Sequence, residues 1–291
     1  MRIWAGLIAC LALTVSANAQ GGGIEILAGE TLFSRGTRVS IAHLYEQKTN
    51  LYSGSKQIDN PKDLEASRQR VILGYNFGVT ARFDVGALLP FVDPEVQSND
   101  GTMGESGVGD ASIYGKYRLY TRDASQNSLN VSVLAGVETP TGQTGSEVPQ
   151  AGTGSWDPFL GLAVTDSRGR FRFDGHMVYK LNTEGSLDIS KGDEWSIGLS
   201  AAYRYLHRPY PGPSHSAKLG ILWQGQTQAA RAGNTLPNSG TERLLLRPAL
   251  GFHPIPAIDI SLNVDIPLYQ HYDGQQLGFD FRTFFALGYR F

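Results

Sequence analysis

The chain has 291 residues, and its 25 lysines and arginines nearly balance its 27 aspartates and glutamates. That balance argues against a nucleic-acid partner, because proteins that bind nucleic acid are usually clearly basic. The chain is rich in glycine, with 35, and its single cysteine excludes a disulfide framework and a thiolate metal site.

The first predicted element is a cleaved signal peptide over residues 1–19. Arg2 gives a positive start, Ile3–Val15 form an apolar run, and Ala17–Ala19 fit an A-x-A cleavage site. The run is shorter than the roughly 20 apolar residues that a membrane helix needs. A lipoprotein signal ending at Cys10 would leave almost no apolar core before the cysteine. We therefore expect export from the cytoplasm.

After the signal, residues 20–36 are expected to form a short N-terminal periplasmic segment, either as a tail or as a partial plug. From there to the end, apolar residues recur at every second position, which is the period of a β-strand. Leu129, Val131 and Val133, for example, alternate with Asn130 and Ser132. Twelve such segments are predicted, starting near Thr37, Arg68, Thr80, Val108, Ser128, Asp157, Arg170, Asp193, Ser216, Thr241, Ala257 and Gly278.

Long and short connections mostly alternate along these segments. Short turns facing the periplasm and longer outer loops are typical of outer-membrane barrels, and an even strand count places both termini on the periplasmic side. Long or medium connections are expected over 48–67, 93–107, 140–155, 183–192, 228–240 and 272–276, and shorter ones at 77–78, 122–127, 167–169, 206–215 and 254–256.

A soluble periplasmic sandwich would also show alternating strands. Two features favour a membrane barrel. Aromatic residues lie near the ends of the apolar faces, as in interfacial girdles, and the opposite faces are heavily charged. The girdle candidates are Tyr117, Trp195, Tyr205, Trp223 and Phe252.

The last predicted strand favours the barrel most strongly. Its alternation places Arg282 and Arg290 inward, and Gly288, Tyr289 and Phe291 resemble the assembly signal of bacterial outer-membrane barrels. The fold expected for residues 37–291 is therefore all-β, an antiparallel transmembrane β-barrel of about 12 strands in the bacterial outer membrane. Its expected lipid-facing residues are Phe279, Phe281, Thr283, Phe285, Leu287, Tyr289 and Phe291.

Charged residues on the polar phase would line the interior of such a barrel. They could form a mesh of salt bridges that stiffens a small barrel, or they could line a path for solutes. The channel-lining candidates are Arg70, Arg82, Asp84, Asp110, Lys116, Arg118, Glu138, Arg172, Asp174, His176, Lys180, Arg204, Arg247 and Arg282.

An enzyme in this barrel would need a nucleophile, a base and an orienting group close together. His176 shares a face with Asp174, and Ser196 or Ser200 follows on the next strand, yet no local motif marks a site. The histidines lack metal-ligand spacing. We expect no enzyme activity, no cofactor and no metal.

Three stretches resemble an outer-membrane family named for the meta-pathway of phenol degradation. They are GVGDASIYGKYRLY at 107–120, LAGVETPTG at 134–142 and GTGSWDPFLGLAV at 152–164. The resemblance implies a transporter for small hydrophobic or aromatic compounds, with outer-membrane lipid and the barrel-assembly machinery as partners.

Two interpretations remain open from the sequence. One is a passive channel for small solutes, hydrophobic or aromatic compounds among them. The other is a closed structural or adhesive barrel whose outer loops bind partners.

Overall fold

A computed structural model describes residues 27–144, 149–209 and 211–291. The predicted signal peptide, residues 1–19, lies outside them. Within the described residues the chain is almost entirely β-strand, with one short 3-10 turn at Ser186–Asp188. None of the described residues belongs to a helix that is long and apolar enough to cross a membrane.

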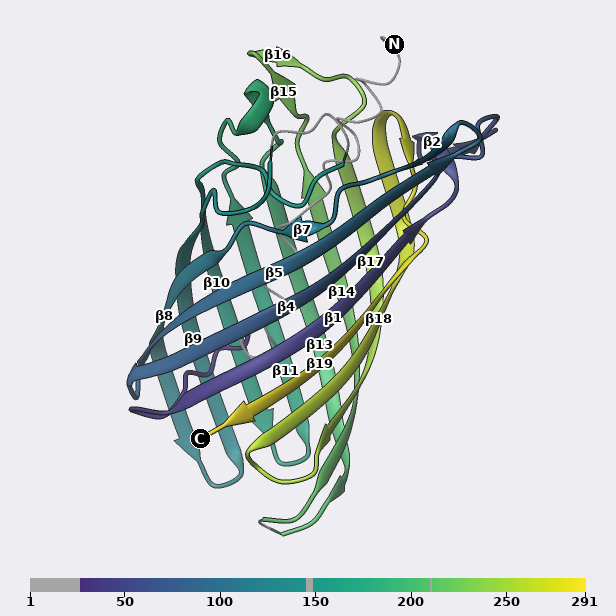
Figure 1. The fold of residues 1–291 in the computed structure, drawn as a ribbon. Coiled ribbons are helices and arrows are strands. Elements are labelled where there is room, and N and C mark those ends of the chain that lie inside the picture. Colours follow the sequence, from purple (N-terminus) through teal and green to yellow (C-terminus); the bar gives the residue numbers. More distant parts are fainter. Residues whose placement is uncertain (1–26, 145–148, 210) are drawn as a thin grey trace.

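Twelve long strands form the wall of a closed antiparallel barrel (Figure 1). Each pairs with the next long strand along the chain, and β1 pairs with β19, so the sheet has no free edge. Closure gives every long strand a hydrogen-bonded neighbour on both sides. A sheet surrounded by lipid requires this, because lipid offers the backbone no hydrogen bonds. The strands are β1 (Thr37–Lys48), β4 (Glu65–Thr80), β5 (Phe83–Ser98), β8 (Ser112–Ala124), β9 (Asn127–Glu138), β10 (Asp157–Arg168), β11 (Phe171–Lys180), β13 (Glu194–His207), β14 (Ser214–Gln226), β17 (Thr241–His253), β18 (Ile258–Leu277) and β19 (Phe281–Arg290).

The predicted fold class and strand count are confirmed. Each expected strand start lies close to the observed one, and the largest difference is residue 108 expected against Ser112 in β8. The period-2 signal is strong here because one face of every strand meets lipid and the other faces the interior.

The tight turn predicted at 77–78 is wrong. Strand β4 continues to Thr80, and the turn to β5 is made by Ala81 and Arg82. Gly78 has a different role, because a Cβ added there would lie 2.2 Å from the carbonyl oxygen of Phe33. The glycine lets the N-terminal segment pass close to the wall, and its own N–H donates to Gly36 at 2.9 Å.

Several expected loops contain short strands. The connection predicted at 272–276 is strand, since β18 continues to Leu277 and pairs with β2 (Leu51–Gly54). The turn to β19 lies instead at 278–280. Other short strands in the connections are β3 (Lys56–Ile58), β6 (Gly101–Met103), β7 (Gly107–Val108), β12 (Ile189–Ser190), β15 (Ala230–Arg231) and β16 (Asn234–Thr235).

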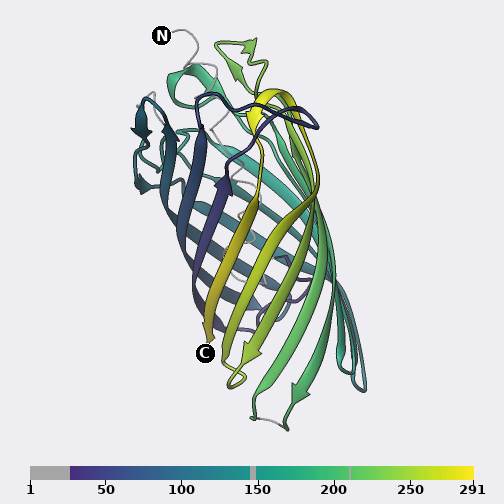
Figure 2. The same ribbon diagram turned by 90° about the vertical axis from the view of Figure 1, so that its right-hand side faces the viewer.

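The two ends of the barrel differ in the length of their connections. The short turns and the C-terminus lie at the lower end in Figure 1, and the long connections with β2, β15 and β16 lie at the upper end. The second view shows the same division (Figure 2). We call the short-turn end periplasmic and the other end outer, following the rule for these barrels.

The faces of the wall are inverted relative to a water-soluble protein. Leu160, Leu199 and Leu219 point outward and are 59%, 68% and 55% exposed, whereas Arg243 and Glu194 point inward and are 1% and 0% exposed. A charge at the middle of a lipid-facing surface costs about 2–4 kcal/mol. The alternation therefore keeps apolar side chains toward lipid and charges inside.

Aromatic side chains cluster near both ends of the outer surface. Trp195 and Trp223 form an edge-to-face pair at 4.6 Å near the outer end. Near the periplasmic end Phe171 lies 5.0 Å from Tyr203, and His215 lies 4.5 Å from Phe252. Aromatic residues at both levels are typical of the interfacial girdles of a membrane barrel.

The last strand has the predicted faces, with one exception. Phe285, Leu287 and Tyr289 point outward, at 47%, 40% and 45% exposure. Phe279 was expected on the same face, but it is fully buried because it lies in the turn before β19, where the alternation is broken. Its ring packs 5.0 Å from the guanidinium of Arg243.

Candidate channel lumen

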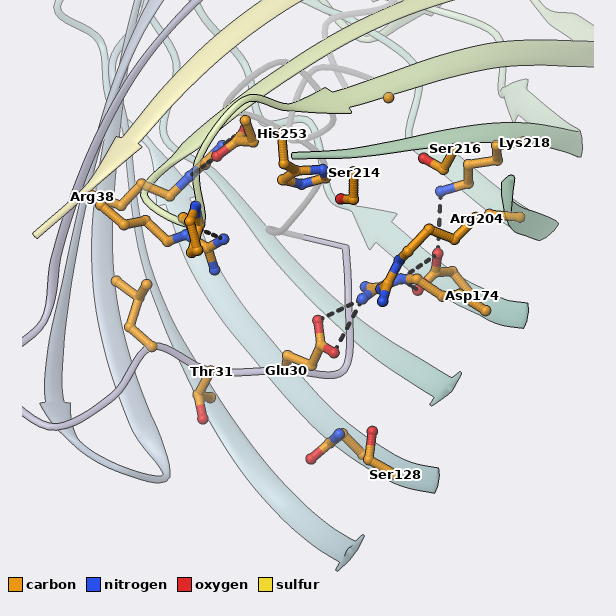
Figure 3. Close-up of a pocket in the computed structure, with 18 of the residues that line it drawn as sticks. Glu30, Thr31, Arg38, Ser128, Asp174, Arg204, Ser214, Ser216, Lys218 and His253 are labelled. Atoms are coloured by element: carbon orange, nitrogen blue, oxygen red, sulfur yellow. Dashed lines mark hydrogen bonds and ion pairs between the residues drawn. The ribbon is translucent and has the colours of Figure 1, made fainter. Parts of the chain in front are cut away.

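A vestibule of about 700 Å³ opens into the lumen at the periplasmic end. Figure 3 shows polar side chains from several strands around it, including Arg204, Ser214 and Lys218. Asp174 accepts hydrogen bonds from Lys218 at 3.2 Å and from Arg172 Nε at 3.0 Å. The vestibule is polar and roomy enough for water and small solutes.

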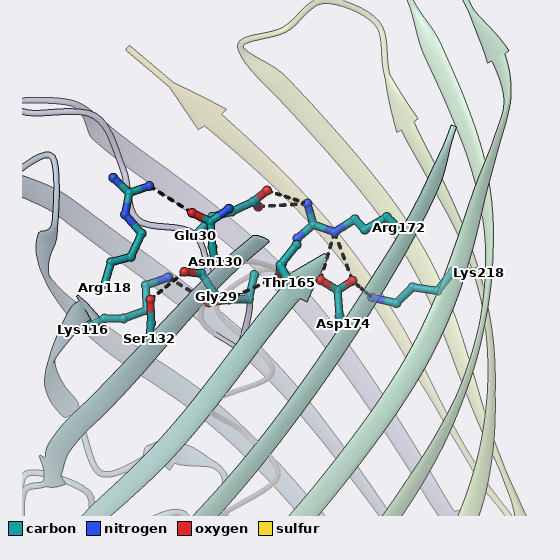
Figure 4. Close-up of polar contacts among 11 residues, drawn as sticks. Gly29, Glu30, Lys116, Arg118, Asn130, Ser132, Thr165, Arg172, Asp174 and Lys218 are labelled. Atoms are coloured by element: carbon teal, nitrogen blue, oxygen red, sulfur yellow. Dashed lines mark hydrogen bonds and ion pairs between the residues drawn. The ribbon is translucent and has the colours of Figure 1, made fainter. Parts of the chain in front are cut away.

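Residues 29–32, before β1, lie against the inner wall and narrow this vestibule. Glu30 forms an ion pair with Arg172 at 2.9 Å (Figure 4). The N–H of Leu32 donates to Asp84 at 3.0 Å. The N–H of Gly29 donates to Thr165 Oγ1 at 3.0 Å, and its carbonyl accepts from Ser132 at 2.6 Å.

Gly29 is required at its position. A Cβ there would lie 2.3 Å from the carbonyl oxygen of Asn130, so a larger residue would displace the segment from the wall. Residues 29–32 contact the inner wall, and the tail or partial plug expected over residues 20–36 stays a prediction. Residues 20–26 lie outside the described part of the chain.

An apolar layer lies inside the barrel above the vestibule, on one side of the lumen. Inward side chains from β1, β4, β5, β8, β9, β11 and β19 meet there, and Leu27 of the N-terminal segment packs among them. Such a layer excludes water and is the usual form of a hydrophobic constriction. We call it the apolar layer: Leu27, Ala42, Leu44, Ile72, Leu88, Tyr114, Leu134, Val178, Phe284 and Ala286, with Phe159 against it.

Charged residues fill the lumen on the outer side of this layer. Asp265 binds Arg282 at 2.6 Å and Arg247 at 2.5 Å. Lys180 lies 3.4 Å from Glu138 and 3.7 Å from Glu194. These ion pairs are almost entirely buried, apart from the partly exposed Arg247. We call this set the outer charged layer.

All the predicted lining residues except Arg82 border one of three internal cavities. Arg82 is exposed in the turn between β4 and β5, because β4 is longer than the sequence suggested. The vestibule holds Asp84, Lys116, Arg118, Arg172, Asp174 and Arg204; a second cavity of about 80 Å³ holds His176, Arg247 and Arg282; and a third of about 50 Å³ holds Arg70, Asp110, Glu138 and Lys180.

Asp110 also fixes an outer loop. Its carboxylate accepts the N–H of Gly142 at 2.9 Å and the hydroxyl of Thr153 at 2.7 Å. A Cβ on Gly142 would lie 2.7 Å from Gly152, so the two loop segments can come this close only because both positions are glycine. The G-D, P-T-G and G-T-G-S motifs, which are separate in the sequence, therefore contact one another in the structure.

The sequence reasoning missed several interior charges and one loop residue. Arg38 and Glu46 lie on the inward phase of β1, so the alternation could have found them. Lys191 follows β12 and lines the third cavity. Burial, with Lys180 and Arg68 nearby, lowers the pKa of Lys191 to about 8. The position of Lys191 at this cavity depends on the conformation of its loop, which no sequence pattern indicates.

The histidine considered for catalysis lies against the wall. A Cβ on Gly198 would lie 2.2 Å from the His176 ring, so this glycine leaves room for the ring. Ser200 stands opposite Asp174 in the register of β11 and β13. Among the described residues, no group of three or more histidine, cysteine or acidic side chains could hold a metal ion.

A closed barrel of twelve strands with an apolar exterior, aromatic girdles and a charged interior defines an outer-membrane β-barrel. The chain belongs to the family described as "Putative MetA-pathway of phenol degradation", which matches residues 63–281. No curated protein matches the chain.

Two solved structures show a similar fold. An outer-membrane channel of Pseudomonas putida F1 has a TM-score of 0.65 and 17% identity, with 90% of this chain and 97% of that chain covered. The β domain of the Bordetella autotransporter BrkA has a TM-score of 0.51 and 11% identity, with 89% and 100% covered. At these identities the likeness concerns the fold.

Proposed function

We propose that this protein is an outer-membrane channel through which small solutes, hydrophobic or aromatic compounds among them, diffuse passively. The observation that carries this proposal is the apolar layer between two polar compartments inside a closed barrel. An apolar constriction resists ions and water more than it resists uncharged apolar solutes. Thermal motion of Leu27 and its neighbours is enough to admit a small solute, since a plug segment need only shift locally.

Two further findings support this class of solute. The family description refers to phenol degradation, and phenol is a small aromatic compound. One solved structure of similar fold is named an outer-membrane channel. The predicted lining residues would tune the passage of solutes.

Single-channel recording in planar lipid bilayers tests the proposal. We expect small, discrete current steps from the purified protein, because the apolar layer limits ion flow. A strain lacking the gene should grow more slowly on aromatic carbon sources at low concentration. An absence of current steps together with normal growth would contradict the channel.

A closed structural barrel is the second candidate function. The buried ion pairs of the outer charged layer and the segment at residues 29–32 favour it, since both fill the lumen. In that case the long outer connections would bind partners. Deletion of a connection such as 228–240 would then abolish partner binding. If the protein is a channel, the same deletion should leave its conductance unchanged.

We further propose that the protein is no enzyme and that the barrel-assembly machinery inserts it into the outer membrane. Phe291 is 59% exposed on the outward face and stacks with Tyr289 at 5.5 Å, so both rings are accessible before closure. Removal of Phe291 should reduce the amount of folded barrel seen as heat-modifiable migration on a gel. Normal migration without Phe291 would contradict this role, and Phe285→Ala, on the same face, is the control.

A further inference from the structure

Arg70 differs from the other buried arginines of the lumen. Arg38 binds Asp259 at 2.8 Å, and Arg282 binds Asp265 at 2.6 Å. Arg70 is only 3% exposed, yet its Nε and one terminal nitrogen have no hydrogen-bond partner in the described part of the chain. Glu46 and Glu194 attract this guanidinium, but neither accepts a hydrogen bond from these two nitrogens. Burying a donor without an acceptor is unfavourable, so such a group points to a place for a ligand.

The strand register explains why Arg70 has no carboxylate beside it. Its cross-strand neighbours are Leu44 on β1 and Val92 on β5. Two residues earlier on the same face, Arg68 stands opposite Glu46. The chain thus supplies a carboxylate directly opposite Arg68 and places apolar side chains at both sides of Arg70.

A small cavity of about 50 Å³ lies in front of this guanidinium. Its cationic side is formed by Arg68, Arg70, Lys180 and Lys191, against two acidic residues. One of these, Asp110, is already occupied by the hydrogen bonds that fix the outer loop. The cavity therefore carries an excess of positive charge, which attracts an anion.

The opposite side of the cavity is apolar. Ile72, Leu88 and Val178 belong to the apolar layer, and Phe159 packs against it. The volume holds a group of a few heavy atoms, since one water needs at least about 10–15 Å³. A carboxylate group or a halide ion fits this volume, and a ring attached to the carboxylate would have to displace part of the apolar layer.

We propose that the cavity at Arg70 binds a small monovalent anion, either the carboxylate group of a solute or a free halide. This proposal extends the proposed function by naming a class of solute. Only the passage of that solute through the barrel rests on the proposed function. Binding itself needs no open channel. An anion in the cavity would accept a charge-assisted hydrogen bond from the guanidinium.

Thermal unfolding of the purified barrel in detergent tests the site. The unfolding midpoint is followed by heat-modifiable gel migration while sodium benzoate, sodium formate or sodium chloride is titrated at constant ionic strength made up with sodium sulfate. Wild type should show a saturable rise in the midpoint. The half-saturating concentration should increase about tenfold or more in Arg70→Gln, because a charge-assisted hydrogen bond is lost.

Two variants serve as controls. Arg70→Lys retains the charge and should keep most of the effect, and Arg82→Gln removes an exposed arginine and should behave as wild type. Without anion, Arg70→Gln should unfold at the same or a higher temperature than wild type, because it removes a buried charge with two donors that no group accepts. A purely structural arginine would instead lower that temperature.

The three salts distinguish the sources of the anion. A rise with benzoate and formate but not with chloride assigns the site to carboxylates, and a rise with chloride alone assigns it to a halide. No saturable rise in wild type, or the same rise in Arg70→Gln, would overturn the proposal. The unfolding assay does not depend on conductance. A saturable rise in the midpoint together with a bilayer recording without current steps would therefore support the anion site and contradict the proposed channel function.

Discussion

The two polar compartments of the lumen hold their charges in different ways. In the vestibule, the side chains of Arg172 and Glu30 remain 27% and 35% exposed although they form an ion pair. In the outer charged layer, Arg282 and Asp265 form a pair in which each side chain is 3% exposed. Exposed pairs contribute little to stability, whereas buried pairs are strongly coupled to the fold. The part of the vestibule around Arg172 and Glu30 can therefore rearrange around a solute. The outer charged layer acts as a fixed frame, as does the vestibule's buried pair of Arg38 and Asp259, with side chains 1% and 6% exposed.

Removing one carboxylate from the fixed frame should have the largest effect. Asp265→Asn leaves Arg247 and Arg282 without their shared anion, so the free energy of unfolding should fall by about 3–5 kcal/mol. Thermal unfolding in detergent measures this change. Asp166→Asn, which breaks a pair with the exposed Arg168 at the periplasmic end, should leave the midpoint unchanged. Equal losses in the two variants would mean that burial does not separate the pairs.

Loosening the vestibule should affect stability less and current more. Glu30→Gln removes the ion pair to Arg172, and a partly exposed pair contributes about 0.2–1 kcal/mol. The segment at 29–32 would lose one of its anchors, so bilayer recordings should show longer or more frequent open periods. Glu105→Gln, on the exposed outer surface, is the matched control. A recording identical to wild type would show that the segment does not limit current.

The smallest expected effect is a change in stability at alkaline pH that arises from Lys191 at the outer end of the barrel. The pKa of Lys191, about 8, lies below its ordinary value because of burial and the nearby Lys180 and Arg68, against the opposing effect of Glu138 and Glu194. Between these two values the unfolded chain binds the proton and the folded chain does not, so stability should rise with pH from about 8 to 10.5. Below pH 8 the penalty of burying the charge is fully present.

Unfolding midpoints measured from pH 7 to 10 in wild type and in Lys191→Met test this sign. The rise should be smaller in Lys191→Met, which has no ammonium to deprotonate. A fall with pH in wild type that is absent in the variant would contradict the assignment.

The sequence predicted the wall far better than the lumen. Alternation in segments such as Leu129–Val133 reports directly which side chains face lipid, because lipid imposes the same requirement on every strand. It also placed Arg282 inward correctly. It failed at Gly78 and Phe279, where a close approach or a turn interrupts the regular strand.

The arrangement inside the lumen depends on register and on contacts between distant segments. Whether an inward arginine meets a carboxylate, as Arg282 does, or apolar neighbours, as Arg70 does, is decided by pairing across strands. A shift of one residue in register would reverse the faces, and no single strand contains that information. The contacts of Gly29 with Ser132 and Thr165 join segments more than 100 residues apart.

The central claim is that the apolar layer forms the barrier of a channel. The most direct measurement is the single-channel conductance of Leu134→Ser, which places a hydroxyl in the layer, beside that of Leu162→Ser. Leu134 is 1% exposed and points inward, whereas Leu162 lies on the neighbouring strand, points to lipid and is 49% exposed. We expect larger current steps for Leu134→Ser and wild-type steps for Leu162→Ser. Wild-type steps, or none, in both folded variants would contradict the claim.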